Sequence, residues 1–284
     1  MRGEKNYNLE LIRIISFVFV ILIHVTNYYC RAYGEIHQSE YVFALILDML
    51  ARVSVPCFFM ITGALLLGRE EPLEKHIRRL LRFFIVLIVW SLIYTLWNNF
   101  YMKTPYNLKT IFYEPAEAHL WYLYAMIPIY MVLPFFQIMC KHMNLRMEQA
   151  FLVVITVAVI YTYLLSFEHE EAYYDLPLVG DKIYSYYVFV GYYIYKYRKH
   201  VIRNQKIPVV LFGCCMGINI IMTFFHTVKN GVHCEKYMEY QNPLLALAAC
   251  MFFIFIIRLK KTEFCPGESV RRIMDLFCGC SFGI

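Results

Sequence analysis

The stretch LIRIISFVFVILIHVTNYYC (residues 11–30) decides the fold, because it is apolar over most of its length and long enough to cross a bilayer. A membrane-spanning helix needs about 20 such residues, whereas a secretory leader ends in a cleavage site of small residues. No such site follows residue 30. The sequence therefore predicts a first membrane span here, and not a leader that is removed.

Similar apolar blocks recur along the chain. Hydrophobic residues make up 60% of its 284 positions and charged residues 17%, which is too little charge to cover a soluble domain of this size. Lipid offers the backbone no hydrogen-bond partners, so the spans should be helices. We expect an all-α, polytopic transmembrane helix bundle of about 9–10 spans, the last of them truncated. It should form a single membrane domain over residues 1–284 with no appended soluble domain. The spans are expected near 11–30, 43–67, 80–100, 119–140, 150–167, 183–197, 207–226 and 242–259, with a ninth beginning near 278.

Basic residues set the predicted orientation. Twenty of the 27 lysines and arginines lie on the N-terminal segment and on alternate connections, only six lie on the opposite connections, and Arg52 lies inside a span. Because basic loops stay in the cytoplasm, this alternation predicts a cytoplasmic N-terminus. The net charge of +6 is then explained by contact with anionic lipid, and no nucleic-acid partner is implied. The ten cysteines show no zinc-site spacing, so we expect no metal.

Ionisable residues inside spans are costly and need a reason. In the first span, Arg13 and His24 are eleven residues apart, which leaves them about 20° apart around the helix and roughly 16 Å apart along it. Ser16 and Asn27 fall on the same stripe. Arg13 could be a membrane anchor, and His24 could be a packing residue. A histidine that faces the bundle interior is also suited to moving protons.

The second span holds Asp48 and Arg52, four residues apart and able to neutralise each other. Arg52 should lie about as deep as His24. The pair could be a structural bridge, or Arg52 could face the same cavity as His24.

The remaining candidates lie at the ends of two spans. Arg78, Arg79 and Arg82 open the third span and could hold phosphates, although membrane anchoring explains such a cluster equally well. His119 and Trp121 begin the fourth span at the opposite boundary, where aromatic residues form a membrane-interface belt or a stacking platform for a sugar.

In this order, these residues resemble the membrane-bound acyltransferase 3 family. The resemblance covers most of the chain and is carried by Arg13-x10-His24, RVSVPCFFMITGALLL (52–67), RRLLR (78–82), HLWYLYAMIPIYMVLPF (119–135) and CSFGI (280–284). Members often end their last helix with a pattern like Ser-Phe-x-Ile-Tyr-Leu-x-His, and this sequence stops inside that pattern.

The resemblance implies transfer of an acyl group, commonly acetyl, from cytoplasmic acyl-CoA to an envelope carbohydrate or lipid-linked glycan. The protein would then be a multi-pass protein of the bacterial cytoplasmic membrane. His24 would be the essential histidine with Arg13 as its partner. Arg79 and Arg82, with Arg78, would bind the donor, and Arg52, Asn27, His119 and Trp121 are candidate acceptor-binding residues. The main alternative is a transporter or flippase, against which the sequence shows no inverted repeat and no matched pair of interrupted helices.

Overall fold

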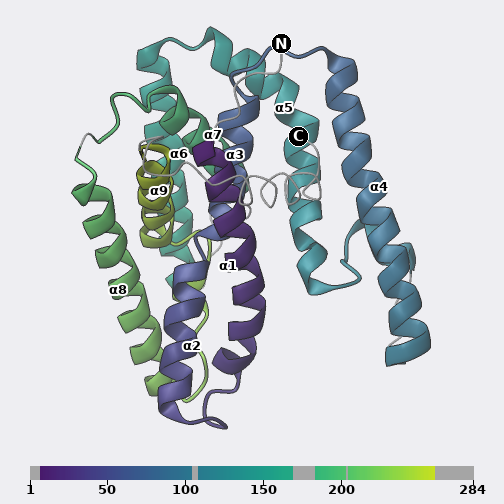
Figure 1. Cartoon of the computed structure of the whole chain (residues 1–284), viewed down its shortest axis with the longest axis vertical. Coiled ribbons are helices and arrows are strands. Elements are labelled where there is room, and N and C mark those ends of the chain that lie inside the picture. Colours follow the sequence, from purple (N-terminus) through teal and green to yellow (C-terminus); the bar gives the residue numbers. More distant parts are fainter. Residues whose placement is uncertain (1–6, 104–107, 169–182, 203, 260–284) are drawn as a thin grey trace. The chain divides into compact units, whose positions relative to one another are not determined.

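The structure, a computed structural model, describes residues 7–103, 108–168, 183–202 and 204–259 (Figure 1). Within these residues all regular secondary structure is helical and no strand occurs, which confirms the predicted all-α bundle. The predicted ninth span near 278 and the closing CSFGI lie outside the described residues, as do the basic residues counted between 260 and 272.

Seven of the eight complete spans that the sequence predicts are long and apolar enough to cross a membrane, so the chain is a multi-pass membrane protein. The exception is the span predicted at 183–197. It contains a helix of only 13 residues, α7 (Tyr184–Lys196), which covers about 20 Å of the roughly 30 Å hydrocarbon layer.

The described helices form two compact units. The first, unit 1, comprises α1 (Tyr7–Arg31), α2 (Gln38–Ala51), α3 (Ser54–Leu66), α6 (Leu145–Glu168), α7, α8 (Lys206–Asn230), η4 (Lys236–Met238) and α9 (Pro243–Ile257). The second, unit 2, comprises α4 (Leu73–Trp97), η1 (Asn98–Met102), η2 (Leu108–Phe112), η3 (Ala118–Leu120) and α5 (Trp121–His142). Helices α4 and α5 pack along each other in unit 2.

Two glycines allow α3 and α7 to pack backbone against backbone at the centre of unit 1. A β-carbon added at Gly63 would lie 1.8 Å from the Val188 carbonyl oxygen, and one at Gly191 would lie 2.2 Å from the Met60 carbonyl oxygen. Small residues at helix interfaces permit such close approach in membranes, where van der Waals contact is a main source of helix association. The short helix α7 is therefore held by its fit against α3.

The second span is broken between α2 and α3. Arg52 caps the C-terminal end of α2, and its backbone N–H bonds back to the Asp48 and Met49 carbonyls. Four residues later Pro56 has no N–H to offer the Arg52 carbonyl and would clash with it in a continuous helix, so the chain turns at Arg52 and Val53. The break leaves a cation at a helix C-terminus, where the helix dipole stabilises positive charge.

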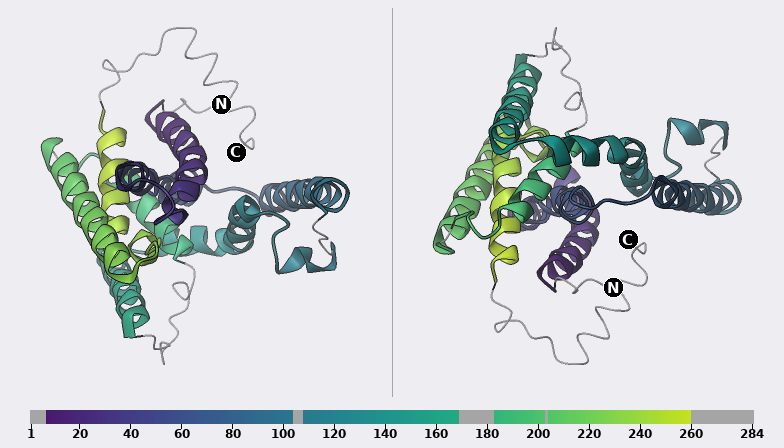
Figure 2. Two further views of the ribbon diagram at one scale, coloured as in Figure 1. Left: turned by 90° about the horizontal axis from the view of Figure 1, so that it is seen from below. Right: turned by 90° about the horizontal axis from the view of Figure 1, so that it is seen from above.

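Helix α9 begins partway along α8 in Figure 1, and the two helices lie side by side in Figure 2. Asn242 caps its first turn by accepting from the Leu244 N–H, and its Nδ2 donates to Asn219 Oδ1 at 2.9 Å. Asn219 lies eleven residues before the end of α8, which corresponds to about 16 Å of helix. The segment that connects α8 to α9 therefore runs back along α8 before α9 starts.

Candidate functional site

Arg13 is paired within its own helix. Its Nη1 lies 2.9 Å from Glu10 Oε2, one turn earlier in α1, and 13% of its side chain is exposed. The i,i+3 spacing of Glu10 and Arg13 would have predicted this pair. Arg13 is thus a mostly buried cation, paired with Glu10 near the Tyr7 end of α1.

The residues of the predicted polar stripe of α1 differ in their burial. Ser16 is fully buried, Asn27 is partly buried and His24 is exposed on the surface of unit 1. The buried side of α1 is instead marked by Leu9, Ile12, Ser16, Thr26 and Cys30. His24 therefore lies at the margin of the packed face of α1.

Asp48 and Arg52 form the ion pair that their spacing predicts, with Arg52 Nε 2.9 Å from Asp48 Oδ2. Asp48 is completely buried, and 15% of the Arg52 side chain is exposed. The other carboxylate oxygen, Oδ1, accepts a hydrogen bond of 2.9 Å from Thr26 Oγ1 in α1. The hydroxyl of Tyr240 is also hydrogen-bonded to Arg52.

These contacts fix the relative depth of the two helices. Thr26 lies level with Asp48, and His24 is two residues, about 3 Å, from Thr26 along α1. Arg52 is one turn, about 6 Å, from Asp48 along the second span. This displacement points toward the same side of the membrane as the displacement from Thr26 to His24. His24 and Arg52 therefore differ in depth by only about 3 Å, as expected from the sequence.

The three arginines at the start of α4 in unit 2 differ in environment. Arg79 is buried and its Nη2 lies 2.9 Å from Glu71 Oε2, while Arg78 and Arg82 are exposed. Glu71 also accepts from Lys75 Nζ at 2.6 Å. The exposed pair is thus Arg78 and Arg82, four residues apart on one face.

A buried polar cluster surrounds Arg79. Its second terminal nitrogen, Nη1, has no hydrogen-bond partner among the described residues, and the buried His76 ring lies one turn earlier on the same helix. Gln137 of α5 lies beside the His76 ring. A buried guanidinium N–H of this kind can donate a hydrogen bond to an oxyanion.

Replacing Glu71 by glutamine will flatten the dependence of stability on acid pH. Burial alone would raise the pKa of the Glu71 carboxyl, but hydrogen bonds from Lys75 and Arg79 outweigh it and hold that pKa below its usual value of 4.5. The pair therefore stabilises the fold above pH 4.5 and loses this contribution as pH falls through the lower folded-state pKa. Melting temperatures of the wild type and Glu71→Gln, measured from pH 7 to pH 3.5, should converge in acid.

Glu70→Gln is the matched control. Glu70 pairs with Lys141 at 2.6 Å, but 78% of its side chain is exposed. Exposed pairs contribute little to stability, so this variant should follow the wild type at every pH. Equal curves for Glu71→Gln and Glu70→Gln would show that the Glu71 pair is not stabilising.

His119 and Trp121 lie at the start of α5 in unit 2. The ring of His119 is exposed and packs edge-on against Tyr94 of α4, with centroids 4.9 Å apart. Trp121 is partly buried and packs against Tyr122. Both interpretations of these aromatic residues, an interface belt and a sugar platform, remain predictions.

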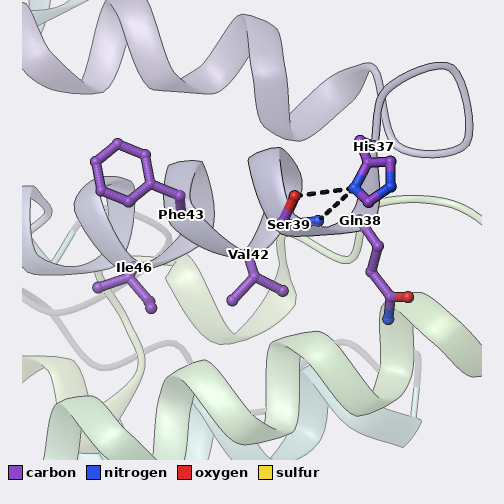
Figure 3. A pocket seen from close by; sticks show the side chains of 6 residues that line it. All are labelled: His37, Gln38, Ser39, Val42, Phe43 and Ile46. Atoms are coloured by element: carbon purple, nitrogen blue, oxygen red, sulfur yellow. Dashed lines mark hydrogen bonds between the residues drawn. The ribbon is translucent and has the colours of Figure 1, made fainter.

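An open groove of about 510 Å³ runs along the first turns of α2. Figure 3 shows the His37 ring hydrogen-bonded to Ser39 at one end of the groove. Val42 and Ile46 point to the same side of the helix. The groove is lined by His37, Gln38, Ser39, Val42, Phe43 and Ile46. None of the predicted site residues lines it, so it is separate from the candidate site.

The structure adds residues that the sequence did not single out. Thr26 and Tyr240 join the Asp48–Arg52 pair, and Glu71 and His76 join Arg79. Thr26 was visible only as one more polar residue in the first span, and Tyr240 was one of 25 tyrosines. Their roles depend on contacts between helices, which spacing within one helix does not reveal.

Comparison with known proteins identifies the family. A family model described as an acyltransferase domain, of the acyltransferase 3 type, matches residues 6–284. No curated protein and no solved structure gives a significant match. The family match covers both units and includes every candidate residue discussed above. The chain therefore belongs to the acyltransferase 3 family and is a multi-pass membrane acyltransferase.

Proposed function

We propose that this protein moves a short acyl group, in the first place acetyl, from acyl-CoA in the cytoplasm to a hydroxyl of an envelope carbohydrate or lipid-linked glycan. The observation that carries the proposal is an exposed histidine, His24, at nearly the same depth as the buried Asp48–Arg52 pair of a family acyltransferase. Acyl transfer uses a general base and a positive charge that stabilises the oxyanion, and these two side chains could supply them.

In the proposed mechanism His24 takes the proton from the acceptor hydroxyl as the hydroxyl oxygen attacks the thioester carbonyl carbon. The new C–O bond forms, and Arg52 stabilises the oxyanion of the tetrahedral intermediate. The C–S bond then breaks, and the His24 imidazolium returns its proton to the CoA thiolate. Arg13 lies roughly 16 Å along α1 from His24, so it would act on another part of the substrate.

The excess of basic residues on alternate connections supports a cytoplasmic N-terminus in a bacterial cytoplasmic membrane. In that orientation Arg78, Arg79 and Arg82 begin their span on the side where CoA is found. Arg79 Nη1, for which the described part of the chain provides no hydrogen-bond partner, and the exposed Arg78 and Arg82 would then hold the donor phosphates.

The test of the function is chain-dependent formation of an acyl ester. Membranes with and without the protein are incubated with acetyl-CoA labelled in the acetyl group, and the glycan and lipid fractions are counted before and after mild base. We expect label that depends on the protein and is released by base, as an ester should be. Membranes that carry folded protein but acquire no such label would overturn the proposal.

The span formed by α2 and α3 is interrupted. Interrupted spans also occur in transporters, where the broken helices surround a binding site in the middle of the membrane. Counterflow of a labelled glycan precursor in liposomes distinguishes this alternative from the transferase. Transport without CoA-dependent product would favour it.

Arg82→Ala should raise the KM for acyl-CoA by about tenfold, since a hydrogen bond to a charged group contributes about 1.5 kcal/mol. Arg82 is a better target than Arg79, because its side chain is exposed whereas removing Arg79 strands the buried Glu71. Arg146→Ala, which removes an exposed arginine at the start of α6, is the control and should leave KM unchanged. Equal KM values for both variants would remove Arg82 from the donor site.

A further inference from the structure

A second groove, called here the α8–α9 groove, lies in unit 1 where α8 begins. It has a volume of about 390 Å³ and is lined by Gln205, Lys206, Val209, Val210 and Phe255. Helices α8 and α9 pack along each other, and Gln205 Nε2 donates a hydrogen bond of 3.0 Å to the Arg258 carbonyl. This bond ties the start of α8 to the end of α9, so both helices contribute to one lined surface.

The walls of the α8–α9 groove are apolar side chains that the protein leaves uncovered. Val209 is 50% exposed and Val210 is 60% exposed, and Phe255 is only partly buried. Both helices belong to segments long and apolar enough to span the membrane. In a bilayer these side chains therefore contact lipid, and the groove is suited to a hydrocarbon chain.

The rim of the α8–α9 groove is basic. The ammonium of Lys206 is exposed and has no ion-pair partner within the described ranges of the chain. The sequence from 196 to 210 holds five lysines and arginines and no acidic residue. An anionic group from outside the protein would therefore meet an uncompensated positive charge at Lys206, whereas a zwitterionic group would bring a second cation next to it.

The charged and apolar parts of the groove follow each other in the order of a phospholipid molecule. Lys206, Val209 and Val210 are three and four residues apart, so they share one face of α8. Lys206 begins the span, and Val210 lies about 6 Å further along the helix. A lysine at the end of a membrane span directs its ammonium to the level of the lipid headgroups. A phosphate at Lys206 would thus be followed inward by an acyl chain against the valines.

We propose that the α8–α9 groove is a binding site for one anionic phospholipid, with its phosphate at Lys206 and an acyl chain against Val209, Val210 and Phe255. This inference goes beyond the proposed function and does not depend on it. It also differs from the general attraction of basic loops to anionic lipid, which is shared among all basic residues near the surface. A site requires Lys206 in particular and requires the acyl chain.

The test is lipid binding to the purified full chain in detergent, measured by native mass spectrometry. The probes are phosphatidylglycerol and phosphatidylcholine with identical acyl chains. We expect Lys206→Gln to weaken the binding of phosphatidylglycerol about fivefold and to leave the weaker binding of phosphatidylcholine unchanged, because one basic residue near the surface contributes about this factor. Glycerol 3-phosphate, which has no acyl chains, should not compete. Full competition by it would overturn the lipid as the ligand.

Two exposed basic residues outside the groove are the matched controls. Lys229→Gln removes a lysine from the other end of α8, and Arg146→Gln removes an arginine at the start of α6. Both variants should bind phosphatidylglycerol as the wild type does, and melting temperatures check that all three variants are folded. A loss in Arg146→Gln equal to that in Lys206→Gln would reduce the effect to general attraction and overturn the site. Wild-type binding by Lys206→Gln would overturn it as well.

Discussion

Alanine at Gly191 will lower the melting temperature of the protein by about 10 °C or prevent its folding, although it adds only one methyl group. The added β-carbon would lie between 2.2 and 2.6 Å from three backbone atoms of Met60. Backbone atoms cannot turn aside as a flexible side chain does, so α3 and α7 must separate. Overpacking of this kind costs about 3 kcal/mol or more, which corresponds to about 10 °C in a protein of this size.

Gly63→Ala should behave in the same way, because its β-carbon would lie 1.8 Å from the Val188 carbonyl oxygen. Gly213→Ala and Gly217→Ala in α8 are the controls, since nothing lies within 4 Å of a β-carbon at either position. Alanine inside a helix is more favourable than glycine by about 0.5–1 kcal/mol, so both controls should melt slightly higher. Similar losses of melting temperature in all four variants would show that α3, α7 and α8 respond to glycine replacement for a reason other than close packing. The measurement is thermal unfolding of the purified protein in detergent.

The difference between these glycines marks the limit of what the sequence could predict. The spans followed from apolar length, and the Asp48–Arg52 pair followed from its spacing, because both depend on residues close together in the chain. Gly63 and Gly191 are 128 positions apart and become important only when α3 and α7 meet. Nothing local separates them from Gly213 and Gly217.

The break in the second span could be predicted from the sequence only in part. Pro56 was visible in the sequence, but prolines also occur in continuous membrane helices, because neighbouring groups can satisfy the freed carbonyl. Here the chain instead turns at Arg52, which has an ion-pair partner in Asp48 one turn earlier. The tertiary contact of Asp48 with Thr26 supports this arrangement, and only the folded structure shows it.

The arginines of α4 show the same limit. The family resemblance grouped Arg79 with Arg82 as donor-binding residues, whereas the structure buries Arg79 with His76 and leaves Arg82 exposed with Arg78. Glu71 decides this difference. It precedes the helix, so periodicity within the span does not include it, and it draws Arg79 inward as a buried ion pair.

His24→Ala should abolish acyl transfer, with kcat at least 100-fold below the wild type, because a general base contributes about 10²–10⁴-fold to such a reaction. His24 is exposed on α1, so its removal leaves no cavity and the melting temperature should not change. The KM for acyl-CoA should also stay constant, since His24 acts on the acceptor hydroxyl. His200→Ala removes an exposed histidine outside the membrane helices and should retain full activity.

The same variant separates direct transfer from an acyl-histidine relay. In the relay, His24 attacks the thioester carbonyl itself, so labelled acetyl-CoA without acceptor would leave label on the wild-type protein and none on His24→Ala. In direct transfer the imidazole only carries a proton, and neither protein is labelled. We expect no label on either, because in the proposed mechanism His24 acts only as a general base. Label at His24 would replace direct attack with the relay, whereas full activity in His24→Ala would exclude both.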